Sequence, residues 1–292
     1  MITTITSSGK GLDTYTLVED SYAYRADNTI DRGLRERIAV ALGYNEEDFS
    51  LIPDQANIGE GCGNPLSIAS LAEGETILDL GSGGGFDALL ASKKVGSNGK
   101  VIGVDMTQKM IDLARRNAEK MGATNTEFIN SRIDKIPVGS GTVDCVISNC
   151  VLNLVPEEDK QQVMHEIYRV LKPGGRVAIS DFLALKPLPQ WMKDDPDLKA
   201  GCVGGAVEMK LMQGWLLELG FEDILLVDTK KDLSLYKDFE SSSADMTPCC
   251  AGSTARAGPN ISETGRKKID YDLNEWICKR SMVASSLHGN GC

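Results

Sequence analysis

The chain has 292 residues, of which 41% are hydrophobic and 25% are charged. This is the composition of a soluble globular protein, long enough for one large domain or for a domain with an appendage. Its 31 basic and 42 acidic residues give a net charge of −11, which disfavours nucleic acid and anionic membranes as partners.

The predicted elements begin with a helical, charged region over residues 1–50, in which RGLRERIAVALGY is the clearest amphipathic stretch. Strands then alternate with helices. Four strands are predicted over residues 75–82, 100–107, 126–133 and 142–150, and a fifth over 176–183. Helices are predicted over 86–96, 108–122 and 156–171. This alternation predicts an α/β fold with a mainly parallel sheet and helices on both faces.

The pattern changes after residue 183, where three prolines interrupt the chain. A helix near 207–220 and a strand over 221–231 indicate a smaller C-terminal part packed over the edge of the sheet. Residues 241–268 are rich in Ser, Gly and Thr and are typical of a flexible linker. The stretch 269–287 is predicted to dock as a strand or a short helix.

The eight cysteines are spread along a chain much longer than a disulfide scaffold. There is no Cys-x-x-Cys pair and there are only two histidines, so no zinc site is predicted. No segment approaches the ~20 apolar residues of a membrane span, and the first residues show no targeting pattern. We therefore expect a cytoplasmic protein with mostly reduced thiols.

The turn DLGSGGGF, residues 79–86, joins the first strand to a helix. Its glycines let the backbone approach a ligand closely, and the N-terminus of the next helix is partly positive. The following strand ends at Asp105, at the distance from the glycines where a carboxylate binds a ribose diol. Alone, the turn fits S-adenosylmethionine, NAD or a purely structural role, although Phe86 stands where dinucleotide enzymes have Gly or Ala.

The form D-x-G-x-G-x-G, beginning at Asp79, resembles motif I of class I methyltransferases that use S-adenosylmethionine, and KPGGR at 172–176 resembles their later turn. The resemblance implies a Rossmann-like fold. It places the glycine turn at the methionine part of the cofactor, Asp105 at the ribose, Met106 and Ile133 at the adenine, and Asn149 near the reactive end. Asp134 would bond the adenine amino group or be a solvated turn carboxylate. The implied cofactor-binding residues are Asp79, Gly81, Ser82, Gly83, Asp105, Met106, Ile133, Asp134 and Asn149.

Three cysteines, Cys62, Cys150 and Cys202, occupy unusual positions, whereas a fourth, Cys145, does not. Cys145 lies inside a predicted strand and is expected in the core, whereas Cys150 ends that strand, where ligands of open α/β sheets bind. Cys62 and Cys202 lie in glycine-rich segments suited to presenting a thiol at a cleft. Three such thiolates would select a soft, thiophilic element, although spacing alone also allows unrelated cysteines.

NIGEGCGNP, SNCVLNLVP and AGCVGGA, together with the glycine turn, resemble arsenite S-adenosylmethionine methyltransferases over roughly residues 50–230. The resemblance implies that Cys62, Cys150 and Cys202 are the catalytic residues and bind arsenic(III) as three thiolates. It implies S-adenosylmethionine as cofactor, arsenite or its thiol conjugates as substrate, and a cellular thiol reductant of the glutathione or thioredoxin type. The expected regions are a helical cap (1–50), a cofactor-binding domain (51–185), an arsenic-binding part (186–240) and a linker with a tail (241–292).

The chain departs from many such relatives in two places. RERIAVALGYNEEDFS lacks the upstream cysteine that they carry, and Gly59 and Glu60 stand where some have a tyrosine. A redox partner for Cys62 and the extent of methylation are therefore open, as is a relay role for Cys249 and Cys250. Two other functions remain: methylation of a small organic acceptor such as a quinone precursor, and arsenic binding without turnover.

Overall fold

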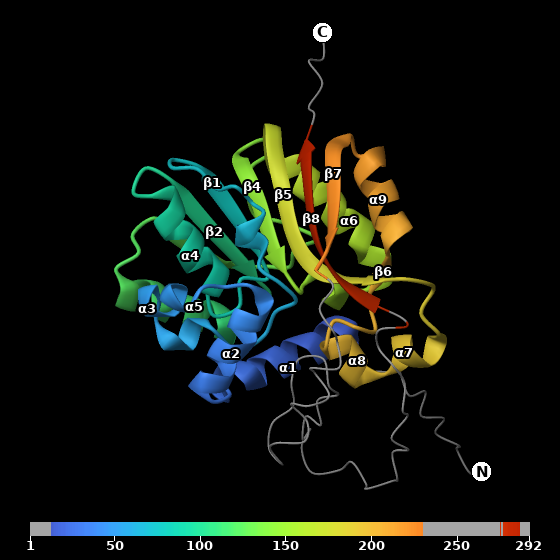
Figure 1. Ribbon diagram of the computed structural model, residues 1–292, viewed down its shortest axis with the longest axis horizontal. Helices are drawn as coiled ribbons and strands as arrows, with labels where there is room; N and C mark the ends of the chain where they lie inside the picture. The colour runs from blue at the N-terminus through green and yellow to red at the C-terminus, as the bar shows by residue number, and fades with distance from the viewer. Residues whose placement is uncertain (1–12, 230–274, 276, 287–292) are drawn as a thin grey trace, which may run out of the picture.

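The computed structural model describes residues 13–229, 275 and 277–286 (Figure 1). Its strands form one sheet in the order β3-β2-β1-β4-β5-β8-β7, with β6 paired to β5. Strands β1 to β6 pair with one another in parallel, and β8 is antiparallel to β5 and β7. The strands are β1 Thr76–Leu80, β2 Lys100–Asp105, β3 Thr126–Asn130, β4 Val143–Asn149, β5 Leu171–Ala184, β6 Val207–Glu208, β7 Phe221–Asp228 and β8 Ile277–Ser286.

Helices cover both faces of this sheet, as the alternating pattern predicts. α4 (Phe86–Val95) and α5 (Gln108–Met121) pack on one face, and α6 (Lys160–Val170) and α9 (Met209–Glu218) on the other. α5 buries Met110, Ile111 and Leu113 on a single side and ends at Gly122, which has a positive φ of 69°. Within the described part of the chain, no helix is both long and apolar enough to cross a membrane.

The pairing of β1 with both β2 and β4 sets the position of the site. The strand order reverses between these pairs, and the crevice at the carboxyl ends of such strands is where open α/β sheets bind ligands. In the β1–β4 register, Leu80 lies opposite Ser148. The glycine turn after β1 and the Asn149-Cys150 segment after β4 therefore emerge side by side.

The C-terminal stretch docks as a strand, one of the two forms expected, but its place inside the sheet was not expected. Residues 277–286, predicted to belong to a tail docked on the domain, form β8, which lies inside the sheet between β5 and β7. Ile277, Met282 and Ala284 are buried there. The stretch ICKRSMVASS has too few apolar residues to indicate an interior strand, because serines fill several of its buried positions. Residues 241–268, which include Cys249 and Cys250, lie outside the described residues.

Short helices close the carboxyl end of the sheet. α1 (Thr14–Asp27) lies beside α8 (Pro196–Ala200) and the short helix η3 (Leu152–Leu154), and α7 (Gln190–Asp194) precedes α8 (Figure 1). α2 (Arg32–Leu42) and α3 (Glu46–Leu51) pack near α4 and α5. Of the N-terminal helices, α1 covers the crevice that the sheet opens, through Tyr15, Val18 and Tyr22.

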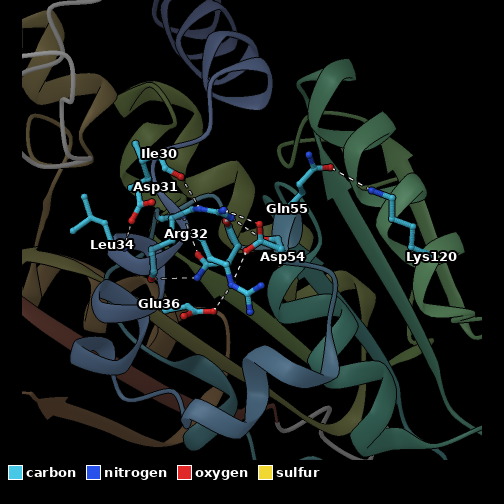
Figure 2. Close-up of polar contacts among 11 residues, drawn as sticks. Ile30, Asp31, Arg32, Leu34, Glu36, Asp54, Gln55 and Lys120 are labelled. Atoms are coloured by element: carbon cyan, nitrogen blue, oxygen red, sulfur yellow. Dashed lines mark hydrogen bonds and ion pairs between the residues drawn. The ribbon is translucent and has the colours of Figure 1, made fainter.

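One buried arginine fixes the segment that leads to Cys62. The Arg35 side chain is 4% exposed and donates to the carbonyl oxygens of Ile30, Asp54 and Asn57 at 2.8, 2.6 and 2.6 Å. It also donates to the carboxylate of Asp54 at 3.0 Å. Figure 2 shows the surrounding contacts, in which Arg32 pairs with Glu36 and Asp54. Residues 54–59 are therefore held by α2.

Arg35→Ala should lower the free energy of unfolding by about 3 kcal/mol, because three carbonyl oxygens and a carboxylate lose their donor. The matched control is Arg32→Ala, whose side chain is 60% exposed and whose loss should cost about 0.5 kcal/mol. Urea unfolding of the three chains measures both values. Equal effects of the two substitutions would contradict the role given to Arg35.

A chain stopped after Phe239 should not unfold cooperatively, because it lacks β8 and leaves the β5 edge unpaired. A chain stopped after Ser286 retains β8 and should unfold like the full chain. Circular dichroism during heating, with size-exclusion chromatography for aggregation, compares them. A cooperative, monodisperse chain 1–239 would show that β8 is dispensable.

Candidate functional site

The crevice lies at the carboxyl ends of β1, β2 and β4, beneath α1. It encloses about 980 Å³ of space between atoms, including space open to solvent. Such a size suits a ligand as large as a nucleoside. Its lining comes from the glycine turn, the ends of the strands and α1, and it includes Tyr15, Val18, Tyr22, Asp79, Gly81, Ser82, Gly83, Asp87, Asp105, Met106, Ile133, Asn149, Cys150, Val151 and Leu154.

The glycine turn needs its glycines for two physical reasons. Gly81, Gly83 and Gly85 have positive φ of 68°, 51° and 91°, which side chains disfavour. A Cβ on Gly81 would also lie 2.4 Å from the Val151 side chain. The turn is buried together with two polar atoms, Asp79 Oδ2 and Ser82 Oγ, that have no hydrogen-bond partner among the described residues. Buried polar atoms of this kind are suited to bind a ligand.

The residues predicted to bind a ribose and an adenine lie at one side of the crevice, except for Asp134. Asp105 accepts hydrogen bonds from the backbone N–H of Gly83 at 3.0 Å and of Thr107 at 2.8 Å, which fixes the turn against the end of β2. Met106 and Ile133 line the crevice. Asp134 does not line it, because Arg132 binds its two carboxylate oxygens at 2.9 and 2.6 Å. Its contact with an adenine amino group stays a prediction.

Asn149 links the crevice to the segment of Cys62. Its Oδ1 accepts from the Cys62 backbone N–H at 2.9 Å, and its Nδ2 donates to the Gly63 carbonyl at 2.9 Å and to the Tyr44 hydroxyl at 3.0 Å. Tyr44 in turn donates to Asp87 Oδ1 at 2.6 Å. One amide therefore positions the thiol segment relative to the glycine turn.

Sequence reasoning missed Tyr44 and Asp87 in this network. Asp87 carried a signal, since it is a carboxylate in the first turn of the otherwise apolar start of α4. No sequence signal indicated Tyr44, because its hydroxyl binds a residue, Asp87, that is 43 positions away in the chain.

The three predicted cysteines come together from distant segments. Cys62 and Cys150 form a disulfide, and the Cys202 thiol donates to the Cys150 carbonyl oxygen at 2.9 Å. All three are at most 3% exposed and share one apolar cluster. Cys150 alone of the three lines the crevice.

The expectation of reduced thiols is wrong for the pair Cys62–Cys150. The fold brings their Cα atoms within 5.2 Å, a separation that a disulfide requires. Cys62 thus has a pairing partner although the upstream stretch lacks a cysteine. Cys145, by contrast, lies in the core as predicted.

Two of these thiols stand on strained backbone. Cys150 and Cys202 have φ of 61° and 63°, in the left-handed region that glycine normally occupies. A residue with a side chain pays on the order of 1–2 kcal/mol for this conformation. Ser70 and Asp223 have the same conformation elsewhere, so two of the four such residues that the structure describes lie where the thiols meet. Strained backbone of this kind is often found at functional sites.

A buried polar group, Asp181, lies beside the disulfide and was not expected from the sequence. One of its carboxylate oxygens and the sulfurs of Cys62 and Cys150 lie within 4.8 Å of one another. Burial raises the pKa of Asp181 to about 7, although hydrogen bonds from Phe182 and Asn153 lower it in part. The signal was present, since Asp181 is a carboxyl group in the middle of the apolar strand VAISDFLA.

Lys160 holds the segment of Cys202. Its side chain is 4% exposed, and its Nζ donates to the carbonyl oxygen of Gly205 at 2.7 Å. Burial lowers the pKa of this amine, and the nearby Glu157 and Asp181 raise it. The sequence indicated only a helix with a charged face, so this buried lysine was also missed.

The crevice is rich in carboxyl groups that are costly to ionise. Burial, then the charges of Asp87 and Asp105, hold the pKa of Asp79 well above its usual range. Burial also raises the pKa of Asp105, and it raises the pKa of Asp87 to about 6, against hydrogen bonds from Tyr44 and Asn149. Such a cluster favours a cationic ligand, because a positive charge offsets the repulsion.

Residues 71–239, more than half of the chain, match the family model described as a methyltransferase domain. The chain belongs to the methyltransferase domain family. Together with the sheet order and the glycine turn, this confirms the predicted Rossmann-like methyltransferase fold.

The methyltransferase domain is similar to several curated arsenite methyltransferases. That of Halobacterium salinarum is 47% identical over 200 residues, which are 68% of this chain and 51% of that protein. The human one is 41% identical over 170 residues, 55% of this chain and 44% of that protein. The chain thus spans about half the length of the curated relatives it matches.

A solved structure is also similar, that of an arsenic(III) S-adenosylmethionine methyltransferase from Chlamydomonas reinhardtii. The alignment has a TM-score of 0.55 and 28% identity, and it covers 88% of this chain and 74% of that one.

The pH dependence of stability tests the buried carboxyl groups. Because the pKa of Asp87 is raised from 3.8 to about 6, the folded chain binds a proton between these values that the unfolded chain does not. The free energy of unfolding should therefore increase as the pH falls from 7 through 6, and Asp87→Asn should weaken this increase. Urea unfolding at pH 7, 6 and 5 measures it, with Asp20→Asn on the exposed side of α1 as control. Equal slopes for Asp87→Asn and the wild type would contradict the raised pKa.

Proposed function

We propose that the chain transfers methyl groups from S-adenosylmethionine to arsenic(III) bound by Cys62, Cys150 and Cys202, giving mono- and dimethylated arsenicals. The observation that carries the proposal is the meeting of these three cysteines at a crevice lined by a methyltransferase glycine turn. The similarity to arsenite methyltransferases supports arsenite as the acceptor.

The crevice fits S-adenosylmethionine, which supplies a methyl group on a cationic sulfonium. Asp79 Oδ2 and Ser82 Oγ, buried and without a hydrogen-bond partner in the described part of the chain, support this fit, and we assign them to the methionine part. Asp105 at the end of β2 is placed for a ribose diol. Met106 and Ile133 provide apolar contacts for a base. The positive charges of the sulfonium and of the ammonium group would offset the repulsion among Asp79, Asp87 and Asp105.

The thiols provide a site for a soft element. Arsenous acid is uncharged at neutral pH, so the net charge of −11 does not repel it. Each thiol that binds replaces an As–OH bond by an As–S bond and releases water. The Cys62–Cys150 disulfide must first accept two electrons and two protons, for which we propose a thiol reductant of the glutathione or thioredoxin type. Lys160 then holds the segment of Cys202 in place through Gly205.

The reaction needs no general base. Arsenic bound by three sulfurs keeps a lone pair, and S-adenosylmethionine, when bound, would supply the methyl group that this pair accepts. The transfer would form an As–C bond, break the S–CH3 bond, release S-adenosylhomocysteine and leave arsenic pentavalent. The same thiol reductant would have to return it to arsenic(III) by two electrons before a second methyl group is added. Cys150 belongs to both the thiol cluster and the crevice, so arsenic on its sulfur is held close to the methyl group. Holding the two reactants at attack distance supplies much of the rate enhancement. Asn149 contributes by fixing the Cys62 segment against the crevice.

Cys150→Ser should lower the rate of arsenite methylation by on the order of 100-fold or more, equal to about 2.7 kcal/mol of transition-state stabilisation. Cys62→Ser and Cys202→Ser should act in the same direction. The matched control is Cys278→Ser, a partly buried thiol of β8 that contacts the Leu183 carbonyl and should keep the wild-type rate. Products from arsenite, S-adenosylmethionine and glutathione are separated by chromatography and quantified by arsenic mass spectrometry.

The same assay separates the rival functions. A wild-type rate in the Cys150→Ser chain would refute the role of this residue. A wild-type chain that binds arsenite in a one-to-one ratio but consumes no S-adenosylmethionine would be a sequestering protein. A chain that methylates a quinone precursor and not arsenite would be an enzyme for an organic acceptor, and would not need Cys62 or Cys202.

A further inference from the structure

Asp181 is a buried carboxyl group that the proposed transfer of a methyl group does not use. It lies in β5, is 3% exposed, and places one oxygen within 4.8 Å of the sulfurs of Cys62 and Cys150. Taking a carboxyl group out of water costs several kcal/mol unless partners replace the lost hydrogen bonds. Its position beside two thiols therefore calls for a partner.

The hydrogen bonds that Asp181 accepts from described residues go to one of its two oxygens. Asp181 Oδ1 accepts from the Asn153 side chain and from the Phe182 backbone N–H, both at 2.8 Å. Asp181 Oδ2 is buried and has no hydrogen-bond partner among the described residues. The carboxyl group is thus held in one orientation by Oδ1, and Oδ2 is available to a ligand.

The chemistry of arsenous acid provides such a partner. Arsenic(III) forms three bonds, so arsenic bound to the sulfurs of Cys62 and Cys150 retains one hydroxyl group. The O–H of this group is a donor, and a carboxyl oxygen close to both sulfurs is in reach of it. The ligand atoms gathered within 4.8 Å of one another are those of Cys62, Cys150 and Asp181, and Cys202 is not among them. The geometry thus suits a state in which two thiols hold arsenic before Cys202 binds it.

We propose that Asp181 Oδ2 accepts a hydrogen bond from the hydroxyl group that remains on arsenic after Cys62 and Cys150 have bound it. The inference rests on the proposed function and makes Asp181 a positioning residue. It holds the two-thiol complex until the Cys202 thiol replaces the hydroxyl group, forming an As–S bond and releasing water. It also sets specificity, because it favours trivalent arsenicals that still carry a hydroxyl group.

The test isolates the two-thiol state. Cys202→Ser stops the reaction there, and Asp181→Ala is then added to it. Equilibrium dialysis of the reduced full-length chains, with arsenic quantified by mass spectrometry, gives the Kd of two probes. Arsenite retains a hydroxyl group when two thiols bind it, whereas phenylarsine oxide retains none because its third bond is to the aryl carbon.

We expect Asp181→Ala to weaken arsenite binding about tenfold, the size of one hydrogen bond to a charged group. Binding of phenylarsine oxide should change less than about twofold, because its two-thiol complex offers Asp181 no donor. The matched control is Asp144→Ala, which removes a carboxylate near the opposite end of β4, where it pairs with Lys172, and should leave both Kd values unchanged.

An unchanged Kd of arsenite after Asp181→Ala would overturn the inference. An equal rise in the Kd of both probes would also overturn it, because Asp181 would then only position the two thiols. A wild-type chain that binds neither probe would instead refute the proposed function. If the alanine chain does not fold, Asp181→Asn keeps an oxygen for Asn153 and Phe182 but offers a donor in place of Oδ2. Asp181→Asn should raise the Kd of arsenite about threefold more than it raises the Kd of phenylarsine oxide. An unchanged ratio of the two Kd values would refute the inference.

Discussion

The parallel pairing of β1 with β4 is the constraint on which the site depends. It brings the glycine turn and Cys150 to the same edge of the sheet, although about 70 residues separate them in the chain. The Asn149 amide makes two hydrogen bonds to the backbone of Cys62 and Gly63, and these fix the Cys62 segment at the same edge. A cofactor crevice and a thiol cluster thus share one strand end.

Features that lower the stability of the folded chain occur together around the end of β4. Cys150 and Cys202 occupy left-handed backbone, and Asp79, Asp87 and Asp181 are buried carboxyl groups with raised pKa values. A sequence selected only for stability would remove both features, for example with glycine and with apolar side chains. Their presence together is explained if the cationic cofactor and the metalloid compensate for them when they bind.

Much of this architecture could be predicted from the sequence, because it depends on local patterns. Alternating strands and helices predicted the parallel sheet, and the glycine turn predicted the crevice and Asp105 at its edge. Met106 and Ile133, which also line the crevice, were indicated by the resemblance to class I methyltransferases. The three cysteines were recognised by resemblance, and the structure places them together. Their burial and the disulfide between two of them could not be predicted, because both depend on distances across the fold.

The features that sequence reasoning missed depend on long-range packing. β8 is polar in sequence, and only its neighbours β5 and β7 make it an interior strand. Arg35 and Lys160 look like surface charges of helices, yet each is buried to hold a segment near a cysteine through carbonyl oxygens. Asp181 was visible as a charge in an apolar strand, but its partners lie on other elements.

The central claim is that three cysteines form one arsenic site beside the cofactor crevice. X-ray absorption spectroscopy at the arsenic edge, on the reduced full chain loaded with one equivalent of arsenite, tests it most directly. We expect three sulfur neighbours per arsenic, and two sulfurs with one oxygen after Cys202→Ser. A shell of oxygen neighbours, or three sulfurs retained after Cys150→Ser, would contradict it.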